Sequence, residues 1–305
     1  MGIRTWLGAL GILALVAGGA GARGGVAARD SSGGAPASAG VAKPIAEAKA
    51  TATSSASATT MVVPAPAHAG KMVDLKSGED TIQAYLAVPK GGGSGAPAMV
   101  VIHEWWGLTD WVKSIADRFA SQGYVAIAPD LYRGQVAADP ELAHELMRGL
   151  PDTRAIRDVR AAAAYLAGRL DLAPKATGVI GFCMGGGISL RSSLDQGPFT
   201  ATVVCYGSPE TDPARLKTLR GPVLGIFGAD DRGLGKDQTD PFEAGLKATG
   251  HLAAVKVYPG AGHAFLNDTR PSYVEAAAKQ AWGEIDGFLA GALQRQKGKG
   301  AATKP

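Results

Sequence analysis

The chain has 305 residues, of which 46% are hydrophobic and 19% are charged, and this composition is typical of a globular protein. Its two cysteines, Cys183 and Cys205, exclude a disulfide-rich scaffold and a four-cysteine zinc site. Of the formal net charge of +4, +3 lies in residues 1–68, so the rest of the chain lacks the basic excess of a nucleic-acid-binding face.

The first residues have the features of a secretory signal peptide, which we expect over residues 1–22. Arg4 supplies a positive charge, residues 6–17 are apolar, and Ala20-Gly21-Ala22 is a small-residue cleavage site. Because spanning a membrane takes about 20 apolar residues, we predict cleavage after Ala22 and a secreted or periplasmic protein without stable membrane insertion. An uncleaved N-terminal membrane anchor is the alternative.

Low-complexity segments flank the region that we expect to fold. Residues 23–69 consist mainly of Ala, Ser, Thr, Gly and Pro and contain no aromatic residue, which predicts a disordered leader. Residues 294–305 form a basic tail that we also expect to be flexible. The folded domain is therefore predicted over residues 70–293.

Short Val- and Ile-rich runs alternate with helical stretches along this domain. Such an alternation predicts an α/β fold with a mostly parallel sheet and helices on both faces, and catalytic residues are then expected at the carboxyl ends of the strands. Ser272 and Glu275 fit a capping box that opens the last helix. We expect strands at 72–75, 81–88, 98–102, 124–128, 176–180, 201–205, 223–227 and 253–258, and helices at 109–122, 140–150, 152–170 and from 271 onward.

The most specific motif is Gly181-Phe182-Cys183-Met184-Gly185-Gly186, which follows a predicted strand and precedes a predicted helix. This context is that of a nucleophile elbow, where side chains at Gly181 and Gly185 would collide with neighbouring backbone. The helix N-terminus favours a thiolate at Cys183, and the Met184 N–H would be an oxyanion donor. The alternative is that Cys183 is a small buried residue at a glycine-rich helix entry.

A thiol nucleophile needs a base, and His263 lies in the loop after the last predicted strand, where this architecture places the base. The preceding predicted strand is followed by Asp230 and Asp231. We favour Asp231 over Asp230 as the acid that orients the imidazole. A turn-forming role for the two aspartates is the alternative.

Glu104 follows the first core strand, where an unpaired buried carboxylate would be costly, so we expect it to have a role in the site. Its loop would lie beside the elbow and could give the second oxyanion donor. No H-E-x-x-H motif, Cys/His cluster or phosphate-binding loop is present, so we predict no metal and no cofactor. The candidate pocket-lining aromatic residues, each of which could equally belong to the core, are Trp105, Trp106, Trp111, Tyr132 and Phe265.

Taken together, these motifs resemble the dienelactone hydrolase family of α/β-hydrolases over essentially the whole predicted domain. The resemblance implies a Cys183-His263-Asp231 triad, a Glu104 that keeps the resting thiol neutral, and an oxyanion N–H from Trp105. It also implies hydrolysis of a small ester or lactone through a thioacyl enzyme, without metal or organic cofactor. The residues that carry it are Glu104 with Gly107, Ala128-Pro129-Asp130-Leu131-Tyr132, Gly181 to Gly186, Gly228 with Asp231, and Gly262-His263-Ala264-Phe265.

One position departs from the family's pattern. Asn267, which we include in the candidate pocket, stands where members that cleave dienelactone have a carboxylate-binding arginine, so dienelactone is not the expected substrate. A non-catalytic binding protein on the same fold and an acyltransferase with the same triad are the alternative functions. Export to an oxidising compartment also allows an inactive Cys183–Cys205 disulfide, against which we expect Glu104 to protect by holding Cys183 as the thiol.

Overall fold

The computed structural model describes residues 68–294. The predicted signal peptide, the predicted leader as far as residue 67, and the tail from residue 295 lie outside the described residues. No helix of the described part is long and apolar enough to cross a bilayer.

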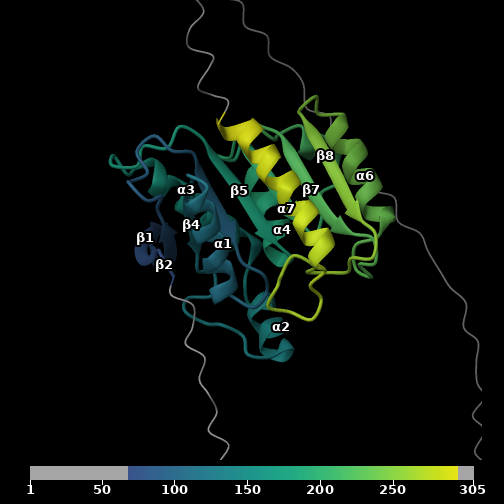
Figure 1. Ribbon diagram of the computed structural model, residues 1–305, viewed down its shortest axis with the longest axis horizontal. Helices are drawn as coiled ribbons and strands as arrows, with labels where there is room; N and C mark the ends of the chain where they lie inside the picture. The colour runs from purple at the N-terminus through teal and green to yellow at the C-terminus, as the bar shows by residue number, and fades with distance from the viewer. Residues whose placement is uncertain (1–67, 295–305) are drawn as a thin grey trace, which may run out of the picture. The chain divides into compact units, whose positions relative to one another are not determined.

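Eight strands form one sheet in the order β1-β2-β4-β3-β5-β6-β7-β8 (Figure 1). β2 pairs antiparallel with both β1 and β4, whereas all the other neighbouring strands are parallel. This topology confirms the predicted α/β fold with a mostly parallel sheet. The strands are β1 (Lys71–Ser77), β2 (Asp80–Ala87), β3 (Ala98–Ile102), β4 (Val125–Pro129), β5 (Thr177–Phe182), β6 (Ala201–Cys205), β7 (Val223–Gly228) and β8 (Ala253–Tyr258).

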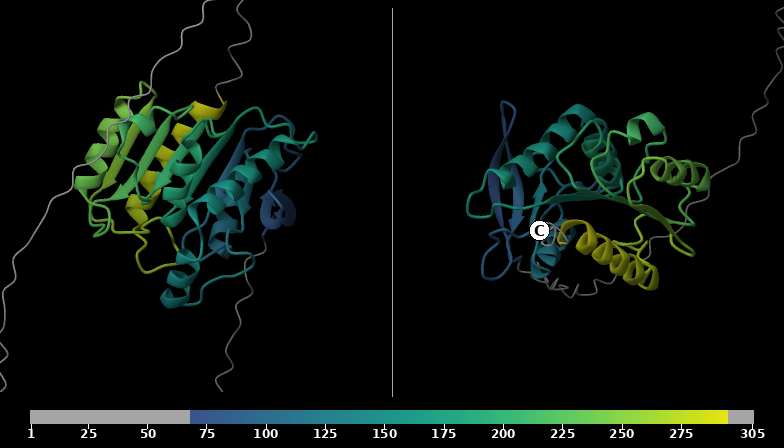
Figure 2. Two further views of the ribbon diagram at one scale, coloured as in Figure 1. Left: turned by 180° about the vertical axis from the view of Figure 1, so that it is seen from behind. Right: turned by 90° about the horizontal axis from the view of Figure 1, so that it is seen from above.

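Helices cover both faces of the sheet, with α1 and α7 on one face and α3 to α6 on the other (Figure 2). α2 lies beyond the carboxyl ends of the parallel strands (Figure 1). A π-helical turn, Ala290–Gln294, continues α7. The helices are α1 (Asp110–Ser121), α2 (Pro140–Arg148), α3 (Asp152–Ala167), α4 (Met184–Ser193), α5 (Pro213–Leu216), α6 (Lys236–Lys247) and α7 (Glu275–Leu289).

The central strands are almost completely buried because helices exclude water from both of their faces. Every residue of β3, β4, β6 and β7 is buried. The register of the parallel pairs aligns the strand ends: Ile102 lies opposite Gly181, Phe182 opposite Cys205, and Gly228 opposite Tyr258. The loops that follow β3, β5, β7 and β8 therefore leave the sheet along one edge.

The beginning of the last helix differs from the sequence prediction. α7 begins at Glu275 with Val274 as its N-cap, and no side chain caps it. Ser272 instead donates its hydroxyl to the carbonyl oxygen of Ala264, and Val274 N–H donates to Phe265 O. The predicted capping box is thus wrong, because Ser272 ties the preceding loop to the His263 loop.

The folded part begins slightly earlier than predicted. His68 Nδ1 lies 3.2 Å from a carboxylate oxygen of Asp117 on α1, and Ala69 N–H donates to the same oxygen at 3.3 Å. Tyr85 of β2 donates its hydroxyl to the other oxygen of Asp117. The two residues assigned to the end of the leader therefore belong to the folded domain.

Candidate active site

Cys183 occupies the turn between β5 and α4 in a backbone conformation that few non-glycine residues adopt, with φ 55° and ψ −118°. Its N–H donates to Cys205 O at 3.0 Å, which fixes the turn to the end of β6. A Cβ atom at Gly181 would overlap the carbonyl oxygen of Gly185, and one at Gly185 would lie 2.5 Å from His103 O. Both positions therefore need glycine, as the motif predicts.

His263 and Asp231 form a hydrogen-bonded pair at the ends of neighbouring strands. Asp231 follows β7 and His263 follows β8, and Asp231 Oδ2 lies 2.7 Å from His263 Nδ1. The other oxygen of Asp231 accepts the Gly233 N–H at 2.9 Å, which orients the carboxylate. Asp230 is exposed, and its side chain makes no hydrogen bond or ion pair within residues 68–294.

The charge states of this pair are coupled to their surroundings. Burial alone would lower the pKa of His263, but its hydrogen bond to Asp231 and its interaction with Cys183 raise that pKa to about 10. Burial alone would raise the pKa of Asp231, but the hydrogen bonds from His263 and the Gly233 N–H hold it below the usual value of 3.8. The geometry thus stabilises a positively charged imidazole beside an ionised carboxylate.

The thiol, imidazole and carboxylate open onto one pocket with a volume of about 580 Å³. Trp105, from the loop after β3, forms part of its wall, and the ring of His144 from α2 packs edge-on against Trp105 at 4.7 Å. α2 also contributes Met147, so this short helix closes one side of the pocket. The lining residues are Trp105, Met147, Cys183, Asp230, Asp231, Arg232, Gly233 and His263.

Two backbone N–H groups next to this pocket have no acceptor among the described residues. Met184 is the first residue of α4, so its N–H cannot bond within the helix. Trp105 N–H likewise donates to no atom of residues 68–294. Unpaired N–H groups beside a nucleophile are the arrangement that binds an oxyanion.

Glu104 is almost completely buried, 3% exposed, and its carboxylate is bonded away from the sulfur. Asn267 Nδ2 donates to Oε2 at 2.8 Å and the Tyr206 hydroxyl donates to Oε1 at 3.4 Å. Thr269 donates both its N–H and its hydroxyl to the amide oxygen of Asn267, which fixes the orientation of the amide. Burial raises the pKa of Glu104, and the bond from Asn267 partly offsets this.

The role expected of Glu104, which is to keep the Cys183 thiol neutral at rest, stays a prediction. No hydrogen bond joins the Glu104 and Cys183 side chains within the described residues; the carboxylate oxygens of Glu104 accept from Asn267 and Tyr206 instead. Tyr206 itself has a positive φ of 38° and packs its ring edge-on against His263 at 5.3 Å. We did not predict a role for this tyrosine, because its only distinguishing feature in the sequence is its position one residue after β6.

Of the residues predicted to line the pocket, Trp105 does so, whereas the others lie elsewhere. Phe265 is fully buried against Tyr206 and Tyr258, and Asn267 binds Glu104. Trp106 packs beneath the guanidinium of Arg270 at 3.9 Å. Tyr132 packs on His103, and its hydroxyl lies 3.2 Å from the Met184 sulfur. Met147 and Arg232, which no sequence motif marks, do line the pocket.

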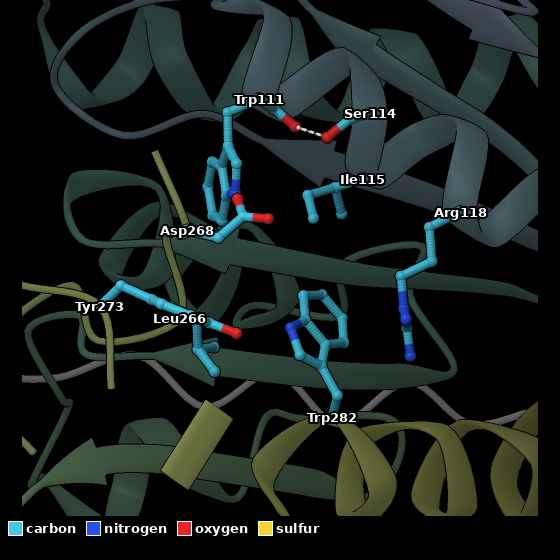
Figure 3. Close-up of a pocket in the computed structure, with 8 residues that line it drawn as sticks. All are labelled: Trp111, Ser114, Ile115, Arg118, Leu266, Asp268, Tyr273 and Trp282. Atoms are coloured by element: carbon cyan, nitrogen blue, oxygen red, sulfur yellow. Dashed lines mark hydrogen bonds between the residues drawn. The ribbon is translucent and has the colours of Figure 1, made fainter. Parts of the chain in front are cut away.

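Trp111 belongs to a separate pocket of about 290 Å³, which lies between α1 and α7 rather than beside Cys183 (Figure 3). Across this pocket, Arg118 of α1 stacks over the Trp282 ring at 4.5 Å and pairs with Asp286 at 2.7 Å. Trp111 of α1 and Trp282 of α7, which both line this pocket, thus help the two helices pack together on one face of the sheet.

Both cysteines are free in the structure. Cys205 is completely buried at the end of β6, and its carbonyl oxygen rather than its sulfur contacts the elbow. Among residues 68–294, no group of three or more His, Cys, Asp or Glu side chains is placed to hold a metal ion.

Comparisons with known proteins agree with this architecture. The model of the dienelactone hydrolase family matches residues 82–293. Protein usf of Aquifex pyrophilus is 34% identical over 224 residues, which are 70% of this chain and 94% of that protein. A Salmonella typhimurium protein named "Putative carboxymethylenebutenolidase" is 32% identical over 238 residues, which are 73% of this chain and 88% of that protein.

A solved structure from Klebsiella pneumoniae, described as a "Putative Dienelactone Hydrolase", superposes with a TM-score of 0.64 at 29% identity. It covers 72% of this chain and 98% of its own. The residues that the family model matches include the elbow and the loops that carry Asp231 and His263. The chain therefore belongs to the dienelactone hydrolase family of the α/β-hydrolase superfamily, and it is a hydrolase.

Proposed function

We propose that the protein hydrolyses a small carboxylic ester or lactone with Cys183 as the nucleophile. The observation that carries this proposal is the Asp231–His263 hydrogen bond of 2.7 Å in the pocket that also contains the Cys183 thiol. Asp231 occupies Nδ1 of the imidazole, so Nε2 is left to exchange a proton with the sulfur. A base oriented in this way beside a thiol is the arrangement of nucleophilic catalysis.

The reaction has two halves. The Cys183 proton passes to His263 Nε2, where the raised pKa of the imidazole retains it, and the thiolate sulfur bonds to the carbonyl carbon while the Met184 and Trp105 N–H groups hold the resulting oxyanion. The carbon–oxygen bond of the leaving alcohol then breaks, and His263 gives that alcohol its proton. A water molecule deprotonated by His263 next attacks the thioester, the carbon–sulfur bond breaks, and Cys183 recovers its proton. Asp231 stabilises the imidazolium in both halves.

The walls of the pocket favour substrates with a compact apolar part. Trp105 and Met147 supply apolar surface beside Cys183, whereas Asp230 and Arg232 are exposed at the rim. Asn267 does not line the pocket, and the position thus supplies no cation for a substrate carboxylate. We therefore expect neutral esters and lactones to be better substrates than dienelactone.

A Cys183→Ala variant tests the proposal, with Cys205→Ala as the matched control. Turnover of a small activated ester should be abolished in Cys183→Ala and retained in Cys205→Ala, because the Cys205 sulfur is buried away from the pocket. Near-ultraviolet circular dichroism should show that both variants fold. Turnover by folded Cys183→Ala at the wild-type rate contradicts the proposal.

We also propose that residues 1–22 direct export and that Cys183 remains reduced afterwards. The second part is supported by the complete burial of Cys205, which does not line the pocket that contains Cys183. The mass of the protein recovered from the periplasm or medium should correspond to cleavage after Ala22, and thiol titration should find both cysteines free. An uncleaved mass argues for the membrane anchor, and the loss of both thiols argues for the disulfide.

A further inference from the structure

His103, the residue between β3 and Glu104, is completely buried and bonded through both ring nitrogens. Its Nδ1 lies 2.6 Å from the carbonyl oxygen of Glu104, and the Leu131 N–H donates to its Nε2 at 3.3 Å. A carbonyl oxygen can only accept and an amide N–H can only donate, so Nδ1 carries the proton and Nε2 is unprotonated. The imidazole is thus a neutral bridge between the loops that follow β3 and β4.

The bridge holds one particular peptide bond. The carbonyl of Glu104 and the N–H of Trp105 belong to the same peptide unit, which is planar and trans, so the two groups point in opposite directions. The carbonyl oxygen accepts from His103 Nδ1 and also from the Gly107 N–H at 3.2 Å. The N–H on the opposite side has no acceptor among the described residues, and the Trp105 side chain lines the pocket of Cys183.

We propose that His103 is a positioning residue that fixes the Glu104–Trp105 peptide with its N–H turned toward the substrate oxyanion. This inference rests on the proposed function, in which the Trp105 N–H is an oxyanion donor. A hydrogen bond to the carbonyl also polarises the peptide and strengthens the N–H as a donor. His103 therefore acts through Trp105 and contacts no reacting atom itself.

The surroundings of His103 fix the imidazole on several sides. The Tyr132 ring packs edge-on against it at 4.9 Å, and Leu131, which donates to Nε2, lies in the loop after β4. On the side of the elbow, a Cβ atom at Gly185 would lie 2.5 Å from His103 O, so the start of α4 packs directly on the His103 backbone. A small movement of the imidazole would therefore change the peptide that it holds relative to the sulfur.

Two substitutions separate the hydrogen bond from the packing. His103→Phe keeps a ring against Tyr132 but removes the donor to Glu104 O, whereas His103→Asn places an amide N–H where Nδ1 stands. We expect kcat for a small ester to fall about 10- to 100-fold in the phenylalanine variant with KM little changed, and to be largely retained in the asparagine variant. An oxyanion interaction is made mainly in the transition state, so its loss lowers kcat rather than raising KM.

Alkylation of Cys183 by iodoacetamide is the second readout. Attack on the iodoacetamide carbon forms no oxyanion, so its rate depends on the thiol and His263 but not on the Trp105 N–H. We expect the same alkylation rate in both variants as in the wild type. His251→Phe is the matched control, since His251 Nε2 also bonds a backbone carbonyl, Leu219 O at 3.0 Å, but does not line the pocket. It should leave kcat unchanged.

Each outcome decides the matter. Wild-type kcat in His103→Phe overturns the inference, and so does a parallel loss of alkylation rate, which would show that the thiol and its base were disturbed. If the phenylalanine variant does not fold, a large loss of kcat in folded His103→Asn overturns it as well, because that variant keeps the donor. Full turnover by Cys183→Ala would instead refute the proposed function, and that result is distinct from all of these.

Discussion

Replacing Asp231 by asparagine tests whether a carboxylate orients His263 during turnover. Asparagine keeps the size of the side chain but removes the negative charge that lies 2.7 Å from His263 Nδ1. A charge-assisted hydrogen bond contributes about 1.5–3 kcal/mol, which corresponds to a loss of roughly 10- to 150-fold in kcat. If the amide turns its own N–H toward Nδ1, the imidazole adopts the wrong tautomer and the loss approaches about 10⁴-fold.

The control is Asp230→Asn, one residue earlier in the same loop. Asp230 lines the same pocket but is exposed, and its side chain has no partner within residues 68–294. Initial rates of ester hydrolysis at saturating substrate should fall strongly in Asp231→Asn and hardly at all in Asp230→Asn. Equal losses in the two variants, or a loss below about tenfold for Asp231→Asn, would refute the assignment of Asp231 as the orienting acid.

Three further predictions concern stability. Folding raises the pKa of His263 from 6.5 to about 10, so the stability that the charged imidazole contributes is fully present below pH 6.5 and is lost as the pH rises through about 10. Between these two pH values, urea unfolding should show a larger decrease in the free energy of unfolding for the wild type than for Asp231→Asn. Equal decreases in the two proteins would contradict this prediction. Asn267→Leu should cost about 1–3 kcal/mol of unfolding free energy, because Oε2 of the buried Glu104 carboxylate loses its donor while Oε1 keeps the Tyr206 hydroxyl. The cost should be smaller at acidic pH, where Glu104 is protonated, and a cost independent of pH would argue against this origin. Gly181→Ala should destabilise the fold by at least about 1–3 kcal/mol through its overlap with Gly185 O, whereas Gly283→Ala in α7, where a Cβ meets nothing within 4 Å, should be neutral or stabilising in thermal unfolding.

The arrangement of the sheet could be predicted from the sequence because its signals are local. The residues of β3 form a continuous apolar run and those of β6 a run interrupted only by Thr202, both with the predicted boundaries, and the elbow motif specifies a tight turn by its glycines alone. The order of strands in this fold then brings the loops of Cys183, Asp231 and His263 to one edge. Topology limited the candidates for the orienting acid to the neighbouring residues Asp230 and Asp231. The hydrogen bond to His263 in the structure distinguishes Asp231 from Asp230.

The features that sequence reasoning missed depend on contacts between distant segments. α6 contains Pro241, which argues against a helix, yet the segment is helical and buries Phe242 and Leu246. Tertiary packing of an apolar face can outweigh the loss of one backbone hydrogen bond. Asn267 binds Glu104 across 163 positions of the chain, and no local pattern indicates that the loop after β8 folds back onto the loop after β3.

A purely structural role for Cys183, as a small buried residue at a helix entry, does not explain why several unusual features of backbone and charge occur around one pocket. A structural cysteine has no need of a positive φ, which costs about 1–3 kcal/mol at a non-glycine residue. A structural loop has no need of a desolvated carboxylate at Asp231, nor of unpaired N–H groups at Met184 and Trp105. The positive φ is a cost to stability, and all of these features are expected if the sulfur faces an oriented imidazole and two oxyanion donors. Their coincidence around Cys183 favours the proposed nucleophilic role of the sulfur over a purely structural one.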